Sequence, residues 1–128
     1  MLSSAPVCPT IAVKDMAVAE AFYKGKLGLK PAPAPEGVVL YESGKGTMLS
    51  LYESAENAGT NQATYATWEV ADFDGTLREL RANGVEFENY DLPGLKTEDG
   101  VASWDDQKAA WFKDPDGNIL CLHSTSAE

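Results

Sequence analysis

Cysteine is scarce in this chain of 128 residues, which contains only Cys8 and Cys121. Two cysteines cannot form the set of disulfides that stabilises small secreted domains, and a reducing compartment would keep both as thiols. No run of apolar residues approaches the roughly 20 that a membrane-spanning helix needs. Residues 1–6 lack the basic residue and apolar core of a signal peptide. We therefore expect a cytoplasmic protein.

Basic residues are also few, and the formal net charge is −10, from 20 acidic and 10 basic side chains. The Lys and Arg residues form no local cluster. An acidic protein without a basic patch is repelled by phosphate backbones and by anionic membranes. This balance argues against nucleic acid and membrane partners.

The residues that are present fall into two similar halves. Asp114-Pro115-Asp116-Gly117 predicts a tight turn, because Pro fixes φ and Gly accepts a positive φ. The segment 117–123 that follows resembles 46–52, and 10–15 resembles 67–72. A length of 128 residues is typical of one domain, and the repeat indicates two fused units within it.

The first half reads as a strand, a helix and further strands. Alternating side chains predict a strand over 10–13, and Asp15 is suited to cap the helix predicted over 16–27. Gly28 is expected to end that helix. The Pro-rich segment 31–35 should be a loop or an edge strand, because proline cannot donate ladder hydrogen bonds. Strands are predicted from Val38 to Tyr41 and from Thr47 to Tyr52.

The second half repeats this order. A strand over 65–70 precedes a helix that Asp72 caps and that ends near Gly84. The alternation in 85–90 predicts another strand. Residues 91–107 show no clean period, which favours a long loop that acts as a lid or binding loop.

This order resembles the vicinal oxygen chelate superfamily, which contains glyoxalases, extradiol dioxygenases, fosfomycin-modifying enzymes and bleomycin resistance proteins. The resemblance is carried by residues 12–15, 21–23, 27–29 and 112–118. It implies an α+β fold in which two tandem βαβββ modules form a curved mixed sheet with a central cup, and helices cover the outer face. The implied single domain, 1–128, comprises a first module at about 5–54, a linker at about 55–63 and a second module at about 64–124.

Enzymes of this superfamily hold a divalent metal with His, Glu or Gln from the first and last strand of each module. Those positions fall here on Cys8, Ser50, Tyr65 and Cys121. A neutral Ser or Tyr hydroxyl is a poor ligand for such metals, and a catalytic zinc site normally has three protein ligands. The resemblance therefore implies a fold without the usual metal site, and we expect no cofactor.

Without a metal, the cup becomes a concave surface suited to a small organic molecule. Trp104 and Trp111 could stack on a flat ligand, and His123 and Glu69 are weak candidates for acid–base chemistry. Single cysteines in such strands are usually small buried side chains. The residues expected to bind the ligand are Cys8, Thr10, Ser50, Tyr52, Tyr65, Thr67, Trp104, Trp111 and Cys121. Ala12, Met48, Ile119 and the acid–base candidates complete the predicted cup.

Three hypotheses remain open from the sequence. The first is a metal-independent protein that binds a small molecule in the cup. The second is a lyase or dioxygenase of the same superfamily, which would use an atypical metal site at Cys8 and Cys121 or a base at His123 or Glu69. The third is an assembly surface, because open sheet edges favour pairing with a second copy, and we expect a homodimer.

Overall fold

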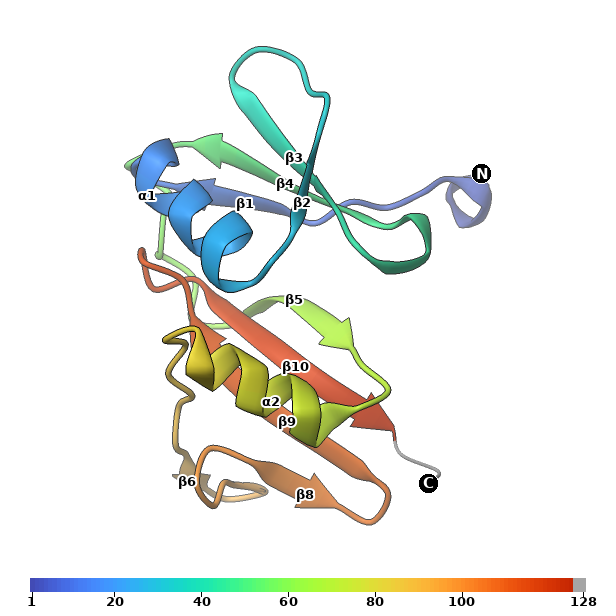
Figure 1. The fold of residues 1–128 in the computed structure, drawn as a ribbon, viewed down its shortest axis with the longest axis vertical. Coiled ribbons are helices and arrows are strands. Elements are labelled where there is room, and N and C mark those ends of the chain that lie inside the picture. The colour runs from blue at the N-terminus through green and yellow to red at the C-terminus, as the bar shows by residue number, and fades with distance from the viewer. Residues whose placement is uncertain (126–128) are drawn as a thin grey trace.

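The computed structural model describes residues 1–125, which form two modules of similar topology (Figure 1). A short 3₁₀ turn, η1 (Leu2–Ser4), precedes the first module. That module contains β1 (Thr10–Val13), α1 (Met16–Glu20), the π-helical η2 (Ala21–Lys26), β2 (Lys30–Ala32), β3 (Val38–Glu42), the 3₁₀ turn η3 (Gly44–Gly46) and β4 (Met48–Glu53). Its sheet has the strand order β1-β4-β3-β2.

The second module has the same arrangement with added strands. It contains β5 (Thr64–Glu69), α2 (Phe73–Ala82), β6 (Asp91–Leu92), β7 (Leu95–Lys96), β8 (Ala102–Trp104), β9 (Gln107–Lys113) and β10 (Ile119–Thr125). The sheet order β5-β10-β9-β8 matches that of the first module. In each sheet the first strand pairs parallel with the last, and the remaining pairs are antiparallel.

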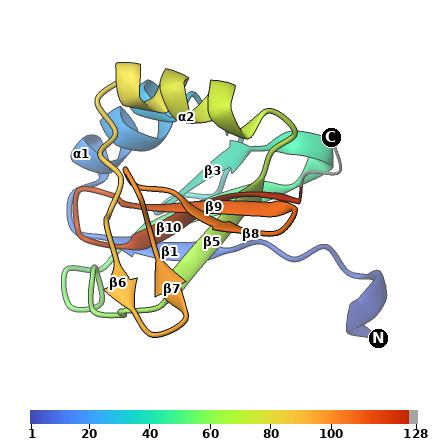
Figure 2. The ribbon, with the colours of Figure 1, turned by 90° about the horizontal axis from the view of Figure 1, so that it is seen from below.

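The core lies between the sheets and the helices, which cover the same side of both sheets (Figure 2). Along each strand, successive side chains point alternately towards the helices and towards the opposite side of the sheet. Ile11 and Val13 are fully buried and belong to the same apolar cluster as Phe22 of the first helical segment. Leu122 of β10 belongs to this cluster too. We call the side of the two sheets away from the helices the open face.

The turn that the sequence singled out joins the modules. The buried Asp114 carboxylate accepts hydrogen bonds from the backbone N–H groups of Asp116 and Asn118 and from the Tyr23 hydroxyl, at 2.7 Å, in the first module. The amide of Asn118 donates to the carbonyl of Ala12 in the edge strand β1, at 2.9 Å. The turn therefore satisfies polar groups at the edge of the first sheet.

The predicted single sheet consists of two sheets that share no backbone ladder. β1 and β5 are their facing edges, and we call the gap between them the seam (Figure 1). No helix among residues 1–125 is long and apolar enough to span a membrane. The cap predictions are confirmed, since Asp15 and Asp72 each accept helix N–H groups and Gly28 has φ of 74°.

The first helix differs from the prediction in its winding. Its α-helical part ends at Glu20, and residues 21–26 form a π-helix in which the N–H of Leu27 donates to the carbonyl of Phe22. The wider turn places the neighbouring side chains Phe22 and Tyr23 in the core together. Pattern alone does not separate this winding from an α-helix.

The strand predicted over 85–90 is wrong. Only an isolated bridge between Phe87 and Phe112 forms, with a hydrogen bond from the N–H of Glu88 to the carbonyl of Trp111. The side chain of Asn89 accepts from the N–H of Gly100, which draws the chain away from β9 after this bridge. β8 takes the neighbouring part of the β9 edge instead.

The prediction that 91–107 lacks regular structure is also wrong. This segment contains the β6–β7 hairpin and β8, whose Ala102 pairs with Ala109 of β9. Trp104 is consequently the last residue of a strand and not part of a free loop. The hairpin extends on the side of the sheets away from the helices (Figure 2).

Candidate functional site

Strand register arranges the open face of the second sheet in rows. Cys121 of β10 is paired with Trp111 of β9 and with Thr67 of β5. The next row joins Ala109, His123 and Glu69. Cross-strand partners project to the same face, and neighbouring rows lie about 7 Å apart. These side chains therefore form one continuous surface.

Glu69 and His123 form a close pair on this surface. The Nδ1 atom of His123 lies 2.6 Å from Oε1 of Glu69, and its Nε2 atom lies 3.0 Å from Oε1 of Gln107. The N–H of Thr125 donates to the second Glu69 oxygen at 2.8 Å. The bond to His123 lowers the pKa of the Glu69 carboxyl, and the backbone bond from Thr125 acts in the same direction.

Cys121 lies beside two aromatic side chains. Its thiol is buried, and burial raises the pKa of Cys121, while a hydrogen bond with Thr67 opposes that rise. Tyr90 meets Trp111 edge to face, with ring centroids 5.8 Å apart. Burial also raises the pKa of Tyr90, with smaller contributions from Glu88 and Cys121. The thiol is therefore a protonated, largely apolar group at neutral pH.

A cavity of about 230 Å³ opens at the seam next to this surface. Thr67 of the second sheet and Met48 of the first lie on its wall, so it touches predicted cup residues from both modules. Trp68 spans the seam, because its indole N–H donates to the Ser43 hydroxyl at 3.2 Å. The remaining lining residues are Val7, Pro9, Thr47, Leu49 and Ala66.

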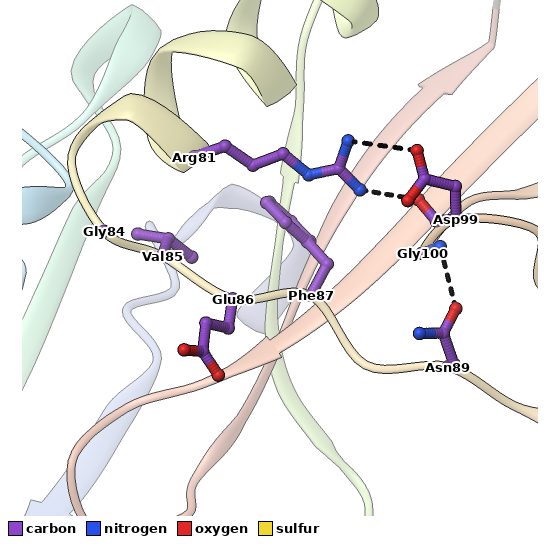
Figure 3. Close-up of a pocket in the computed structure, with 8 residues that line it drawn as sticks. All are labelled: Arg81, Gly84, Val85, Glu86, Phe87, Asn89, Asp99 and Gly100. Atoms are coloured by element: carbon purple, nitrogen blue, oxygen red, sulfur yellow. Dashed lines mark hydrogen bonds and ion pairs between the residues drawn. The ribbon is translucent and has the colours of Figure 1, made fainter.

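Further cavities lie elsewhere among residues 1–125, including one of about 410 Å³ between Lys96, Glu98, Val101 and Ser103. One of about 190 Å³ lies on the helix side, between Leu27, Leu80 and Phe112. A larger one, of about 420 Å³, lies beyond the end of α2 and is shown in Figure 3. Its Arg81 guanidinium is paired with Asp99, so the charge that a ligand would meet is already neutralised.

The predicted site residues divide between the two modules. Thr67, Trp111, Cys121, Glu69 and His123 come together on the second sheet, as described above. Tyr65 lies where the register between β5 and β10 shifts, and it is partly buried against the core cluster. Thr10, Ser50 and Tyr52 belong to β1 and β4 of the first sheet, where Ser50 is buried and Tyr52 half-buried. Trp104 of β8 is the cross-strand partner of Gln107 in β9, and it is 41% exposed.

The expectation that the Cys8 side chain is buried is wrong, whereas its role as a ligand-binding residue stays a prediction. Cys8 lies before β1 and is exposed, whereas Cys121 is buried as expected. Among residues 1–125, no three His, Cys, Asp or Glu side chains are grouped so that they could hold a metal ion. The side chains at the four family positions, two of them hydroxyls, therefore do not fit a catalytic divalent metal.

Sequence reasoning missed Gln107 and Tyr90. Gln107 begins β9, and the same alternation that placed Trp111 would have placed Gln107 on the same face if the strand had been extended back to it. Tyr90 lies in a segment predicted as a strand, and its contact with Trp111 depends on how that segment crosses the sheet. Only the alternation of β9 offered a usable signal.

The paired strand–helix–strand modules and the shared open face define a protein class built on duplicated βαβββ units. A family model described as the Glyoxalase/Bleomycin resistance protein/Dioxygenase superfamily matches residues 7–122. The chain belongs to this superfamily. No curated protein matches the chain.

Solved structures of similar fold cover nearly the whole chain. A glyoxalase/bleomycin resistance protein from Catenulispora acidiphila DSM 44928 is 24% identical, with a TM-score of 0.72 and coverage of 94% of this chain and 98% of that one. TnmS3, an antibiotic binding protein from Streptomyces sp. CB03234, is 22% identical, with a TM-score of 0.69 and coverage of 98% and 99%. A glyoxalase/dioxygenase from Nostoc punctiforme is 17% identical, with a TM-score of 0.68 and coverage of 92% and 88%. At these identities the likeness establishes the fold.

Proposed function

We propose that this protein binds a small, flat organic molecule at the seam and on the adjoining open face of the second sheet, without a catalytic metal. The observation that carries the proposal is the cavity of about 230 Å³, which borders the open face at Thr67. Small-molecule sites are concave and mostly apolar, with a few polar groups that fix orientation. The seam supplies apolar walls, and the neighbouring rows supply Trp111 and His123.

The relatives support binding as the function in general terms. One structure of the same fold, TnmS3, is described as an antibiotic binding protein. The four family metal positions of this chain hold two hydroxyls, an exposed thiol and a buried thiol. Binding needs shape and a few oriented polar groups, which this surface has, whereas metal-assisted lyase or dioxygenase chemistry needs a ligand set.

The proposal includes a cytoplasmic location. Both cysteines of the chain are unpaired, with Cys8 exposed to solvent. An exposed thiol is compatible with a reducing compartment, where it would not be drawn into disulfide exchange.

A thermal-melting screen of chelator-treated protein against flat aromatic and heteroaromatic compounds tests the proposal. A compound at about 100 times its dissociation constant stabilises by about 2.7 kcal/mol, which raises the midpoint by several degrees in a domain of this size. Thr67→Phe should fill the seam cavity and abolish the rise. Thr60→Phe, in the exposed linker, is the matched control and should leave it intact.

The proposal is wrong if no compound raises the midpoint. It is also wrong if the bound compounds stabilise Thr67→Phe as much as they stabilise the unaltered protein. Circular dichroism of both variants would establish that each has kept its fold.

A further inference from the structure

Three side chains from three adjacent strands form a hydrogen-bonded line across the open face. Glu69 of β5, His123 of β10 and Gln107 of β9 meet at 2.6 Å and 3.0 Å. The Glu69 carboxylate is held from a second side by the N–H of Thr125. The imidazole ring is thereby fixed in both position and orientation.

Stability does not account for this line. The side chain of Glu69 is 60% exposed and that of His123 is 23% exposed. Exposed pairs of this kind contribute little to the free energy of unfolding. What the pair does achieve is orientation: an ionised carboxylate only accepts hydrogen bonds, so Nδ1 of His123 carries a proton towards Glu69 and Nε2 is directed at Gln107.

The Gln107 side chain shows which type of group can pair with Nε2 of His123. Its Oε1 atom lies 3.0 Å from that nitrogen, and this oxygen accepts from Nε2 when the ring carries a proton on both nitrogens, as an imidazolium paired with the Glu69 carboxylate does. Gln107 is exposed at the start of β9, and its side chain can be displaced without disturbing the core. A carbonyl oxygen on a bound molecule would meet the same donor at the same distance.

Aromatic surfaces flank this donor on two sides. Trp104 is the cross-strand neighbour of Gln107 and is 41% exposed. Trp111 occupies the next row beyond His123 on the same face, and its indole N–H is anchored to the Thr64 hydroxyl at 3.2 Å. A flat molecule that placed an oxygen at Nε2 would therefore contact an indole ring.

We propose that His123 is held beside Glu69 as an imidazolium and that its Nε2 is the hydrogen-bond donor that recognises an acceptor oxygen of a flat, uncharged ligand, with Glu69 as the positioning residue and Gln107 as the group that the ligand oxygen replaces. This inference rests on the proposed function. An uncharged carbonyl suits the site better than an anion, because the chain has a net charge of −10 and Glu69 already balances the ring. The proposal thus names the class of ligand: a planar aromatic molecule with a carbonyl group.

Two probes of equal shape test it: 2-acetylnaphthalene, which has a carbonyl oxygen, and 2-isopropenylnaphthalene, in which a CH₂ group replaces that oxygen. Affinities follow from quenching of tryptophan fluorescence. We expect the unaltered protein to prefer the acetyl compound about tenfold, because a hydrogen bond to a strong donor contributes at least that ratio. His123 is the only histidine of the chain, so its ring nitrogens give a single set of ¹⁵N signals.

Variants separate recognition from packing. His123→Phe, which keeps a flat ring but has no donor, should remove the preference and leave the affinity for the isopropenyl compound unchanged. Glu69→Gln should reduce the preference and shift the Nδ1 signal, which a purely structural role would not require. Gln107→Ala removes the competing carbonyl and should strengthen binding of the acetyl compound. Lys108→Ala is the control, because Lys108 adjoins Gln107 in sequence but pairs with Asp74 on the helix side.

Each result decides between the proposals. Equal affinity of the two probes for the unaltered protein, or a preference that survives His123→Phe, overturns this inference and leaves the proposed function standing. If neither probe binds, while the compound screen finds other flat ligands without a carbonyl, the inference also fails. If no flat compound binds at all, the proposed function fails with it.

Discussion

At the scale of single residues, the buried polar pair of Tyr23 and Asp114 shows how the modules depend on each other. Tyr23 is fully buried and donates to the Asp114 carboxylate at 2.7 Å. Burial is the largest cause that raises the pKa of Tyr23, and the negative charge of Asp114 adds to it. The Tyr23 phenol therefore stays neutral at pH values well above those at which an ordinary tyrosine ionises.

This shift predicts a loss of stability in alkali. Above the unfolded-state pKa of about 10, the unfolded chain releases the Tyr23 proton while the folded chain retains it. The folded state then binds more protons, so the free energy of unfolding falls as pH rises, by up to about 1.4 kcal/mol per pH unit from this group. Urea unfolding between pH 9 and 11 measures the slope.

Tyr23→Phe should flatten that slope by about one proton. Tyr52→Phe, which removes a half-buried phenol on the open face, serves as the control. An unchanged slope in Tyr23→Phe would contradict the account. The variant should also lose about 1 kcal/mol near neutral pH, because Asp114 loses a hydrogen-bond partner.

The two cysteines carry a second prediction at this scale. Cys8 is exposed before β1, and Cys121 is buried with a raised pKa, so neither is prepared to hold a metal with the Ser50 or Tyr65 hydroxyl. We expect chelator-treated protein to show no rise in its melting midpoint with Zn²⁺, Ni²⁺, Mn²⁺ or Fe²⁺. A rise of several degrees that Cys121→Ser removes would reinstate the metal-dependent alternative.

At the scale of elements, the start of α2 shows how a cap constrains its neighbour. The Asp72 carboxylate accepts from the N–H of Gly75 at 3.1 Å. A Cβ atom at Gly75 would come within 2.2 Å of the Asp72 side chain. Glycine is therefore favoured at this position by the cap, because any larger residue would displace the Asp72 carboxylate, and not by the helical backbone, where it is otherwise unfavourable.

A double-mutant cycle tests this coupling. In the unaltered protein, Gly75→Ala should lower the free energy of unfolding, because the capping side chain must move and a cap contributes about 1 kcal/mol. In the Asp72→Ala background the same change should raise the free energy of unfolding by about 0.5–1 kcal/mol, since the clash is gone and Ala favours the helix. The same sign in both backgrounds would refute the coupling.

At the scale of the whole molecule, the surface left uncovered indicates a second copy. The N-terminal segment extends from the body and exposes Met1, Leu2 and Val7 (Figure 1). β2 and β8 are the outer edge strands of the two sheets, and among residues 1–125 neither pairs with a further strand on its outer side. Exposed apolar side chains and free edges favour pairing with another chain, and we propose a homodimer.

Light scattering coupled to gel filtration at micromolar concentration should give a mass twice that of the single 13.7 kDa chain. Lys substitutions at Leu2 and Val7 should shift the population towards monomer, because they place charge in the apolar contact. Lys substitutions at the exposed Ala55 and Thr60 of the linker provide the control. A monomer at all concentrations would contradict the proposal.

The sequence by itself determined the duplicated fold, because each of its signals is local. The caps at Asp15 and Asp72, the helix end at Gly28 and the turn at 114–117 depend on neighbours a few residues away. Alternation likewise assigned Thr67, Trp111 and Cys121 to one face, since strand side chains have a fixed period of two.

Only the tertiary structure decided where segments of the chain that are distant in sequence meet. Whether residues 85–90 form a strand depends on which segment pairs with the edge of β9, and β8 does so. The exposure of Cys8 depends on where β1 begins to pair with β4. The contact between Glu69 and His123 joins residues 54 positions apart through strand register. Register and edge occupancy are set by packing across the whole sheet, which local patterns do not contain.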